Sequence, residues 1–118
     1  MFNLLRFFKA KSKFQKHSSN FYFSAAITTE DFKEMQNLNI KTIVSCVPDS
    51  ELSNNTFSEI HHKSDEYNLK SYHIPFSPGQ MTQDHIDKAR EITKNNSSPF
   101  LFYCRSGRRA QAIIQRVE

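Results

Sequence analysis

A short apolar run that leads directly into a basic, glycine-containing loop is the feature that most constrains how this chain folds. Residues 99–103 are apolar and aromatic, follow the polar turn residues 95–98, and are typical of a buried strand in a parallel sheet. Cys104 comes at the carboxyl end of this strand, and residues 109–118 have the pattern of the helix that follows. Ligands of open α/β sheets bind at this edge, so we expect Cys104 to lie at a ligand site.

The remaining residues alternate between strand and helix patterns. Strands are expected at residues 21–23, 41–46 and 70–74, and helices after Thr28 or Thr29, over residues 57–67, and after Thr82. Such alternation implies a parallel sheet covered on both faces. We therefore predict an α/β fold of three layers, with a small, mostly parallel sheet flanked by helices.

Composition places the chain among small globular proteins. Its 118 residues are 37% hydrophobic and mix both charge signs, which is enough for one domain with a modest core. Two cysteines give no disulfide framework and indicate thiols in a reducing compartment, so we expect a cytoplasmic protein. No apolar stretch is long enough to span a bilayer.

The net charge of +4 comes from the N-terminal residues. Five cations precede the first acidic residue: Arg6, Lys9, Lys11, Lys13 and Lys16. Because the rest of the chain is slightly acidic, we expect no nucleic-acid partner. We divide the chain into a basic, apolar arm at residues 1–20 and a single catalytic domain at residues 21–118. The arm could make weak contact with an anionic membrane surface, but its apolar residues lack a clean helical stripe, which favours an arm without that function.

The loop after Cys104 has the residues that activate a thiol. A thiol reacts as the thiolate, which a helix N-terminus and nearby cations stabilise. The backbone N–H groups of residues 105–109 can form a nest for an anion. The residues expected around the sulfur or the anion are Arg105, Ser106, Gly107, Arg108 and Arg109, with the Ser106 hydroxyl as a candidate hydrogen-bond donor to the thiolate. A lone cysteine usually only packs in the core, but three arginines and a glycine have no packing purpose here.

The spacing within this loop bears on the chemistry. Four residues separate Cys104 from Arg109, whereas phosphatases that use a cysteine have five residues before their arginine, a position that Ala110 occupies here. The shorter loop leaves less room for a tetrahedral phosphate. It suits a single transferred sulfur atom, as in rhodanese-like sulfurtransferases.

Three runs together resemble a known family. The runs AAITTEDFKEMQNLNIKTIVSCVPDSE, YHIPFSPGQMT and FLFYCRSGRRA resemble the phosphatase-like domain family of beta-lactamase hydrolase-like proteins, some members of which are assigned as sulfurtransferases. The resemblance implies a dual-specificity-phosphatase-like fold, with Cys104 as the nucleophile and Arg109 as the anion clamp. Val47 and Ser50 depart from the family pattern, which has arginine and glycine there.

The position of a general acid separates two functions. A phosphatase of this kind usually has an aspartic acid on the loop facing the cysteine, here residues 75–82, which contain none. Asp49 is the only substitute, and a simple turn-forming role is favoured for it. Sulfur transfer needs no acid. Our first hypothesis is therefore a sulfurtransferase that takes sulfur from thiosulfate or a persulfide through a Cys104 persulfide. The alternative is a phosphatase that acts on phosphate esters through a phosphocysteine, and the third is a silent anion-binding module.

Two further residue types were weighed. Cys46 ends a neighbouring strand at the same edge, so it is a candidate redox partner of Cys104, although a small core residue is the favoured interpretation. The histidines lack the spacing of metal ligands, and we predict no metal site and no cofactor. Among them His73 is the one to examine for contact with the loop.

Overall fold

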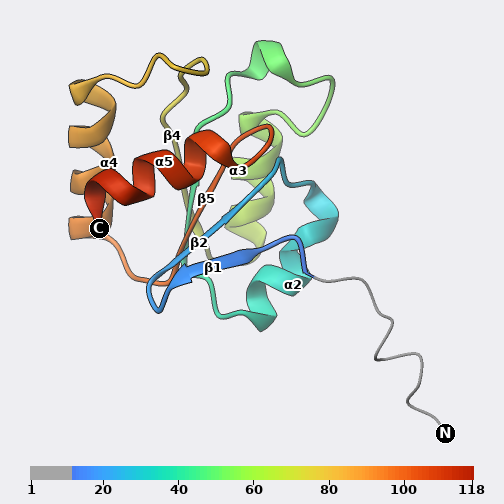
Figure 1. Ribbon diagram of the computed structural model, residues 1–118. Helices are drawn as coiled ribbons and strands as arrows, with labels where there is room; N and C mark the ends of the chain where they lie inside the picture. The colour runs from blue at the N-terminus through green and yellow to red at the C-terminus, as the bar shows by residue number, and fades with distance from the viewer. Residues whose placement is uncertain (1–11) are drawn as a thin grey trace, which may run out of the picture.

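The computed structural model describes residues 12–118, and it has the predicted α/β fold of three layers (Figure 1). A five-stranded sheet has the order β1-β2-β5-β3-β4. Its strands are β1 (Gln15–Ser18), β2 (Phe21–Ser24), β3 (Thr42–Ser45), β4 (Lys70–His73) and β5 (Phe100–Tyr103). Strands β2, β5, β3 and β4 run parallel and only β1 is antiparallel, so the predicted mostly parallel sheet is confirmed.

Helices cover both faces of the sheet (Figure 1). The described residues form α2 (Phe32–Asn37), α3 (Phe57–Glu66), α4 (Gln83–Asn95) and α5 (Arg108–Val117), with short 3-10 turns η1 (Thr29–Asp31) and η2 (Asp49–Glu51). Helix α5 packs on β5 and β2 and also against α4, whereas α3 packs on β4. The residues Ala110, Ile113 and Ile114 of α5 are buried, as their spacing predicts.

Helix starts and ends follow the capping residues of the sequence. Thr28 forms a capping box with Asp31. Thr82 forms another with His85, whose Nδ1 accepts a hydrogen bond from the Thr82 N–H at 2.9 Å. Asn39 has a φ of 63° after α2, the left-handed conformation that asparagine tolerates at a helix end. These local signals explain why most predicted helix starts are right.

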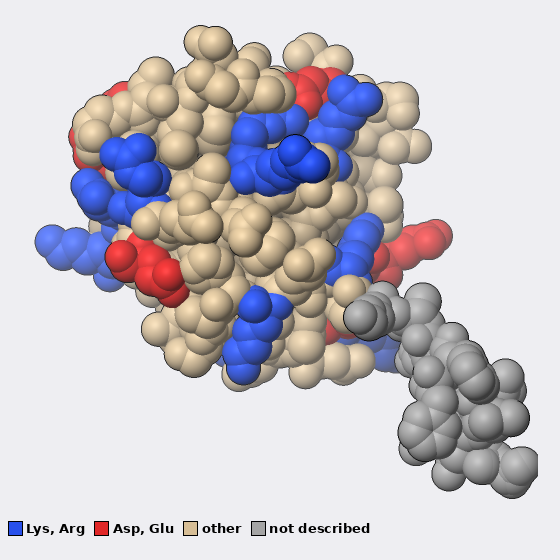
Figure 2. Space-filling view, in the orientation of Figure 1, with Lys and Arg blue, Asp and Glu red and all other residues tan. Residues whose placement is uncertain are grey.

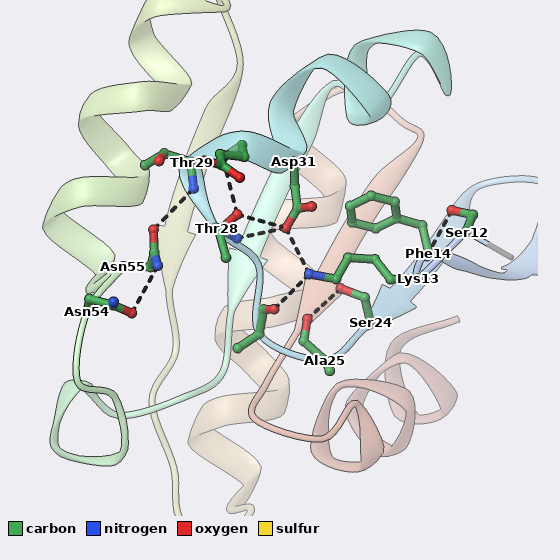
Figure 3. Close-up of polar contacts among 12 residues, drawn as sticks. Ser12, Lys13, Phe14, Ser24, Ala25, Thr28, Thr29, Asp31, Asn54 and Asn55 are labelled. Atoms are coloured by element: carbon green, nitrogen blue, oxygen red, sulfur yellow. Dashed lines mark hydrogen bonds and ion pairs between the residues drawn. The ribbon is translucent and has the colours of Figure 1, made fainter. Parts of the chain in front are cut away.

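Strand β1 lies inside the segment that the sequence analysis assigns to a separate arm. Its residues pair with β2, where Lys16 lies beside Tyr22, and Phe14 just before it is buried. Lys13 donates to the carbonyl of Ala26 at 3.2 Å and to Asp31 at 2.9 Å (Figure 3). The domain boundary at residue 21 is therefore too late. The sequence missed β1 because QKHS has no alternation of apolar and polar residues. The rest of the predicted arm, residues 1–11, lies outside the described residues.

The centre of the sheet brings both cysteines to one edge. All four residues of β3 and all four of β5 are buried, since each strand has a neighbour on both sides. Ser45 lies beside Tyr103 in the parallel register, and the Cys46 N–H donates to the Tyr103 carbonyl at 2.7 Å. Cys46 and Cys104 are the first residues after these two neighbouring strands, at the same edge of the sheet. Within residues 12–118 no helix has the length and apolar character needed to cross a membrane.

Candidate active site

The Cys104 sulfur lies at the start of α5 and is held by the loop that follows it. Cys104 is fully buried, and its Sγ accepts a hydrogen bond from the Gly107 N–H at 3.0 Å. Gly107 has a φ of 95°, and a Cβ there would come within 3.4 Å of the Ser24 backbone. The left-handed conformation at Gly107 therefore favours glycine, whereas the 3.4 Å approach is an ordinary van der Waals contact. The turn that glycine permits aims an N–H at the sulfur, which stabilises a thiolate.

Strand β2 and the loop after it hold the other side of the Cys104 loop. The Cys104 N–H donates to the Ser24 carbonyl at 3.3 Å, and the Ala26 N–H donates to the Arg105 carbonyl at 3.5 Å. The Ala26 carbonyl in turn accepts a hydrogen bond from Lys13 Nζ, the same nitrogen that Figure 3 shows bound to Asp31. The N-terminal residues that the sequence analysis treated as an arm therefore support the loop through Ala26.

Arg109 lies in the first turn of α5 and is nearly buried, with 8% of its surface exposed. Its Nη1 donates to Glu51 Oε2 at 3.0 Å and to the Phe76 carbonyl at 2.8 Å, and its Nη2 donates to Glu51 Oε1 at 2.7 Å. The hydrogen bond from Arg109 lowers the pKa of Glu51, and the same bond raises the pKa of Arg109. The guanidinium is therefore fixed by an ionised carboxylate and by the loop that faces Cys104.

One edge of the Arg109 guanidinium makes no hydrogen bond within residues 12–118. The bonds to Glu51 and Phe76 use both Nη1 hydrogens and one Nη2 hydrogen. The Nε–H and the second Nη2–H, which point the same way, have no acceptor among residues 12–118. A parallel pair of N–H donors of this kind matches two oxygens of a tetrahedral anion.

The remaining loop side chains face solvent. Arg105, Ser106 and Arg108 are exposed, and Figure 2 shows basic side chains gathered where α5 begins. The Ser106 hydroxyl accepts from the Arg108 N–H at 3.4 Å. The hydrogen bond that we expected Ser106 to give the sulfur is thus replaced by that of Gly107. The predicted loop residues come together, with the two exposed arginines at the rim.

Asp49, the candidate general acid, is engaged elsewhere. Its Oδ1 accepts a hydrogen bond from the Phe57 N–H at 3.0 Å, at the first residue of α3. This contact ties the turn to the start of α3, whereas the role favoured from the sequence was a bond of Asp49 within its own turn. The carboxylate that reaches the Cys104 loop is Glu51, which sequence reasoning missed. Its one signal was a position in the same acidic turn as Asp49, and no local pattern pairs it with Arg109, 58 residues away.

Cys46 differs from Cys104 in its surroundings. Burial, and then the nearby Cys104, raise the pKa of the Cys46 thiol well above its ordinary value. Cys46 therefore stays a neutral thiol and does not compete as a nucleophile. Both cysteines are free thiols.

The histidines take structural positions. His73 bonds through Nε2 to the Val47 carbonyl at 2.9 Å and stacks on Phe57 at 4.6 Å, so it supports the loop after β3 rather than the Cys104 loop. His85 stacks on Phe76 at 4.9 Å. Over the described part of the chain, no group of three or more His, Cys, Asp or Glu residues is placed to hold a metal ion.

Comparisons with known proteins agree on one family. Residues 13–115 match the family described as beta-lactamase hydrolase-like protein, phosphatase-like domain, and the chain belongs to this family. A search of curated protein sequences gives no significant match.

Solved structures with the same fold are phosphatases by name. A candidate phosphatase from Neisseria meningitidis has a TM-score of 0.80 at 24% identity, over 88% of this chain and 75% of that one. A candidate phosphatase from Shewanella putrefaciens has a TM-score of 0.76 at 12% identity, over 98% and 73%. The core of the S. cerevisiae PP-IP phosphatase SIW14, in complex with citrate, has a TM-score of 0.68 at 24% identity, over 87% and 62%.

The family and the fold shift the balance between the two enzyme hypotheses. They support a cysteine-based, phosphatase-like protein, as the resemblance of the sequence motifs implied. Neither the family description nor these three structures carries the name of a sulfurtransferase. The four-residue spacing of the loop, which led us to sulfur, is thus weaker evidence than the rest of the chain.

Proposed function

We propose that the protein is a phosphatase that forms a phosphocysteine on Cys104. The observation that supports this most is the hydrogen bond from the Gly107 N–H to Cys104 Sγ, 3.0 Å long, at the start of α5. A thiolate stabilised there attacks phosphorus, and the bond from phosphorus to the leaving oxygen breaks with its electron pair on that oxygen. Water then attacks the phosphocysteine, which releases phosphate and a proton and restores the thiolate.

In this proposal the loop binds the phosphoryl oxygens. The free Nε–H and Nη2–H of Arg109 take two oxygens, and backbone N–H groups of residues 105–109 take the charge that develops during transfer. Glu51 is a positioning residue, because it holds the guanidinium by two hydrogen bonds. Arg105 and Arg108 attract small anionic substrates. The citrate bound to the SIW14 core fits the same preference for anions.

Sulfur transfer through a Cys104 persulfide stays a second candidate. The observation that favours it is the loop of residues 75–82, which faces Arg109 through the Phe76 carbonyl and contains no acid. A sulfite or thiolate leaving group departs as an anion and needs no proton. A silent anion-binding module is the third candidate, and it requires that Cys104 form no covalent adduct.

The deciding experiment compares two substrates on three proteins. Wild type, Cys104→Ser and Cys46→Ala are each assayed with a nitrophenyl phosphate and with thiosulfate plus an acceptor thiol. The proposal predicts phosphate release by wild type and Cys46→Ala and none by Cys104→Ser. Thiosulfate turnover without phosphate release would support the second candidate, and ligand binding without turnover of either would support the third.

Two further roles are proposed beside the catalytic one. Cys46 can form a reversible disulfide with Cys104 that protects the nucleophile from over-oxidation.

Weak contact of residues 1–20 with an anionic membrane is a separate proposal. This proposal rests on the cations of the sequence alone. Its test is to compare the binding of the protein to anionic vesicles with and without residues 1–11.

A further inference from the structure

The site holds cations around the leaving group but offers it no proton. The loop of residues 75–82 supplies a carbonyl to Arg109 and no carboxylate. We infer that the enzyme selects phosphoryl donors whose leaving group departs as a stable anion, an inference that rests on the proposed phosphatase function. Such donors are phosphoanhydrides, acyl phosphates and aryl phosphates of acidic phenols. Alkyl phosphates such as phosphoserine are poor substrates on this account.

The carboxylates close to the loop are engaged in other hydrogen bonds. Glu51 is ionised and bound through both oxygens to Arg109, which lowers its pKa. Asp49 accepts the Phe57 N–H at the start of α3. Within residues 12–118 the side chain of Arg109 hydrogen-bonds to the Glu51 carboxylate and the Phe76 carbonyl, so its partners include no free carboxylic acid. Residues 1–11 contain no Asp, Glu or His that could supply one.

The histidines near the site do not supply the missing proton donor. His85 is the histidine next to the facing loop, where it stacks on Phe76. Its Nδ1 accepts the Thr82 N–H at 2.9 Å, so the ring serves the capping box at the start of α4. His73 Nε2 bonds to the Val47 carbonyl at 2.9 Å, in the loop after β3.

The arginines stabilise an anion without giving it a proton. A guanidinium stays protonated at any working pH, so Arg109, Arg105 and Arg108 lower the energy of negative charge on the departing oxygen but do not neutralise it. The exposed positions of Arg105 and Arg108 also suit a leaving group that is itself a phosphate. The leaving oxygen therefore departs with its electron pair and meets a proton only in water.

Dependence on the leaving group tests this inference. The value of kcat/KM is measured for aryl phosphates whose phenols differ in pKa, for pyrophosphate, and for glycerol phosphate as an alkyl ester. We expect kcat/KM to fall steeply as the phenol becomes less acidic. The alkyl ester should be slower than a nitrophenyl phosphate by more than about 10²-fold, the scale of the missing acid catalysis.

The outcomes separate the inference from the proposed function. Similar kcat/KM values for aryl and alkyl esters would overturn the inference and leave the phosphatase intact. No phosphate release from any substrate, and no phosphocysteine, would overturn the phosphatase itself. Asp49→Asn is the matched variant, because the amide oxygen can still accept the Phe57 N–H. The slope compared is that of log kcat/KM against the pKa of the leaving phenol. If Asp49→Asn leaves this slope unchanged, the inference is supported. A steeper slope in the variant would identify Asp49 as the acid and contradict the inference.

Discussion

Two cysteines follow neighbouring strands at the same edge of the sheet, and the surroundings of their sulfur atoms differ. Cys104 follows β5 and receives the Gly107 N–H at 3.0 Å. Cys46 follows β3, and among the described residues no N–H donates to its sulfur. Burial then raises its pKa, so it stays protonated. Both thiols are fully buried, so burial alone does not separate a reactive cysteine from an inert one.

The chain after each cysteine makes the difference. Val47 and Pro48 follow Cys46, and proline has no N–H to contribute to an anion site. Cys104 is followed by a glycine turn and then directly by α5, whose first N–H groups have no helical partner. A strand end at the sheet edge thus supplies position, and the following loop supplies the charge stabilisation.

Removal of each thiol should separate the two positions most strongly. Cys104→Ser should lower kcat/KM for a nitrophenyl phosphate by at least about 10³-fold, because the nucleophile is lost. Cys46→Ala should keep activity close to wild type, since Cys46 takes no part in the chemistry. Steady-state kinetics on both folded variants measure the contrast. Equal losses in the two would mean that the sheet edge, and not the loop, sets reactivity.

Arg109→Lys should produce the next largest effect. Lysine keeps the charge but not the fork of parallel N–H donors, so we expect kcat/KM to fall by about 10² to 10³-fold. Arg108→Lys is the matched control, since this side chain is exposed at the rim. A loss for Arg108→Lys as large as that for Arg109→Lys would show that net charge matters more than the bidentate geometry.

Glu51→Gln should have a smaller effect on activity and a visible effect on stability. The amide weakens the hold on Arg109, and we expect kcat/KM to fall about tenfold. The depressed pKa of Glu51 makes its contribution to stability fully present above the ordinary value of 4.5. That contribution is lost as the pH falls through the lowered value.

Urea unfolding of wild type and Glu51→Gln at neutral and at acid pH checks this sign. The wild type should be the more stable at neutral pH, and the two should converge in acid, where Glu51 is protonated. A difference in the free energy of unfolding that does not change with pH would show that ionisation of Glu51 contributes nothing.

Peroxide treatment probes the contact between the two thiols. Hydrogen peroxide oxidises the Cys104 thiolate to a sulfenic acid, and the Cys46 thiol then condenses with it to give a disulfide and water. Wild type should regain activity with a reducing thiol, whereas the activity of Cys46→Ala should be lost irreversibly. Full recovery of Cys46→Ala, or no disulfide in wild type by peptide mass, would contradict the proposed role of Cys46.

Local patterns explain which parts could be predicted from the sequence. Thr28, Thr82 and Asn39 act through nearby backbone groups, so helix limits were predictable. The apolar run before Cys104 has a pattern specific enough to place β5. Strand β1 was missed because its residues are polar and its pairing with β2 is a tertiary effect.

In the candidate site, too, the features set by neighbouring residues could be predicted and those set by tertiary contacts could not. Gly107 and the arginines follow Cys104 directly, so the loop could be recognised. Glu51 was missed because its partner Arg109 is distant in sequence, and only folding reveals that the two meet. Asp49 was the more visible acid in that turn, yet its carboxylate turns to the start of α3.

The most direct test of the central claim is to trap the covalent intermediate. Wild-type protein is mixed with a nitrophenyl phosphate, quenched rapidly in acid and digested, and the peptide containing Cys104 is analysed by mass spectrometry. The account predicts one added phosphoryl group on Cys104 and none on Cys46. A peptide without a phosphoryl group, together with one added sulfur on Cys104 after thiosulfate treatment, would contradict it.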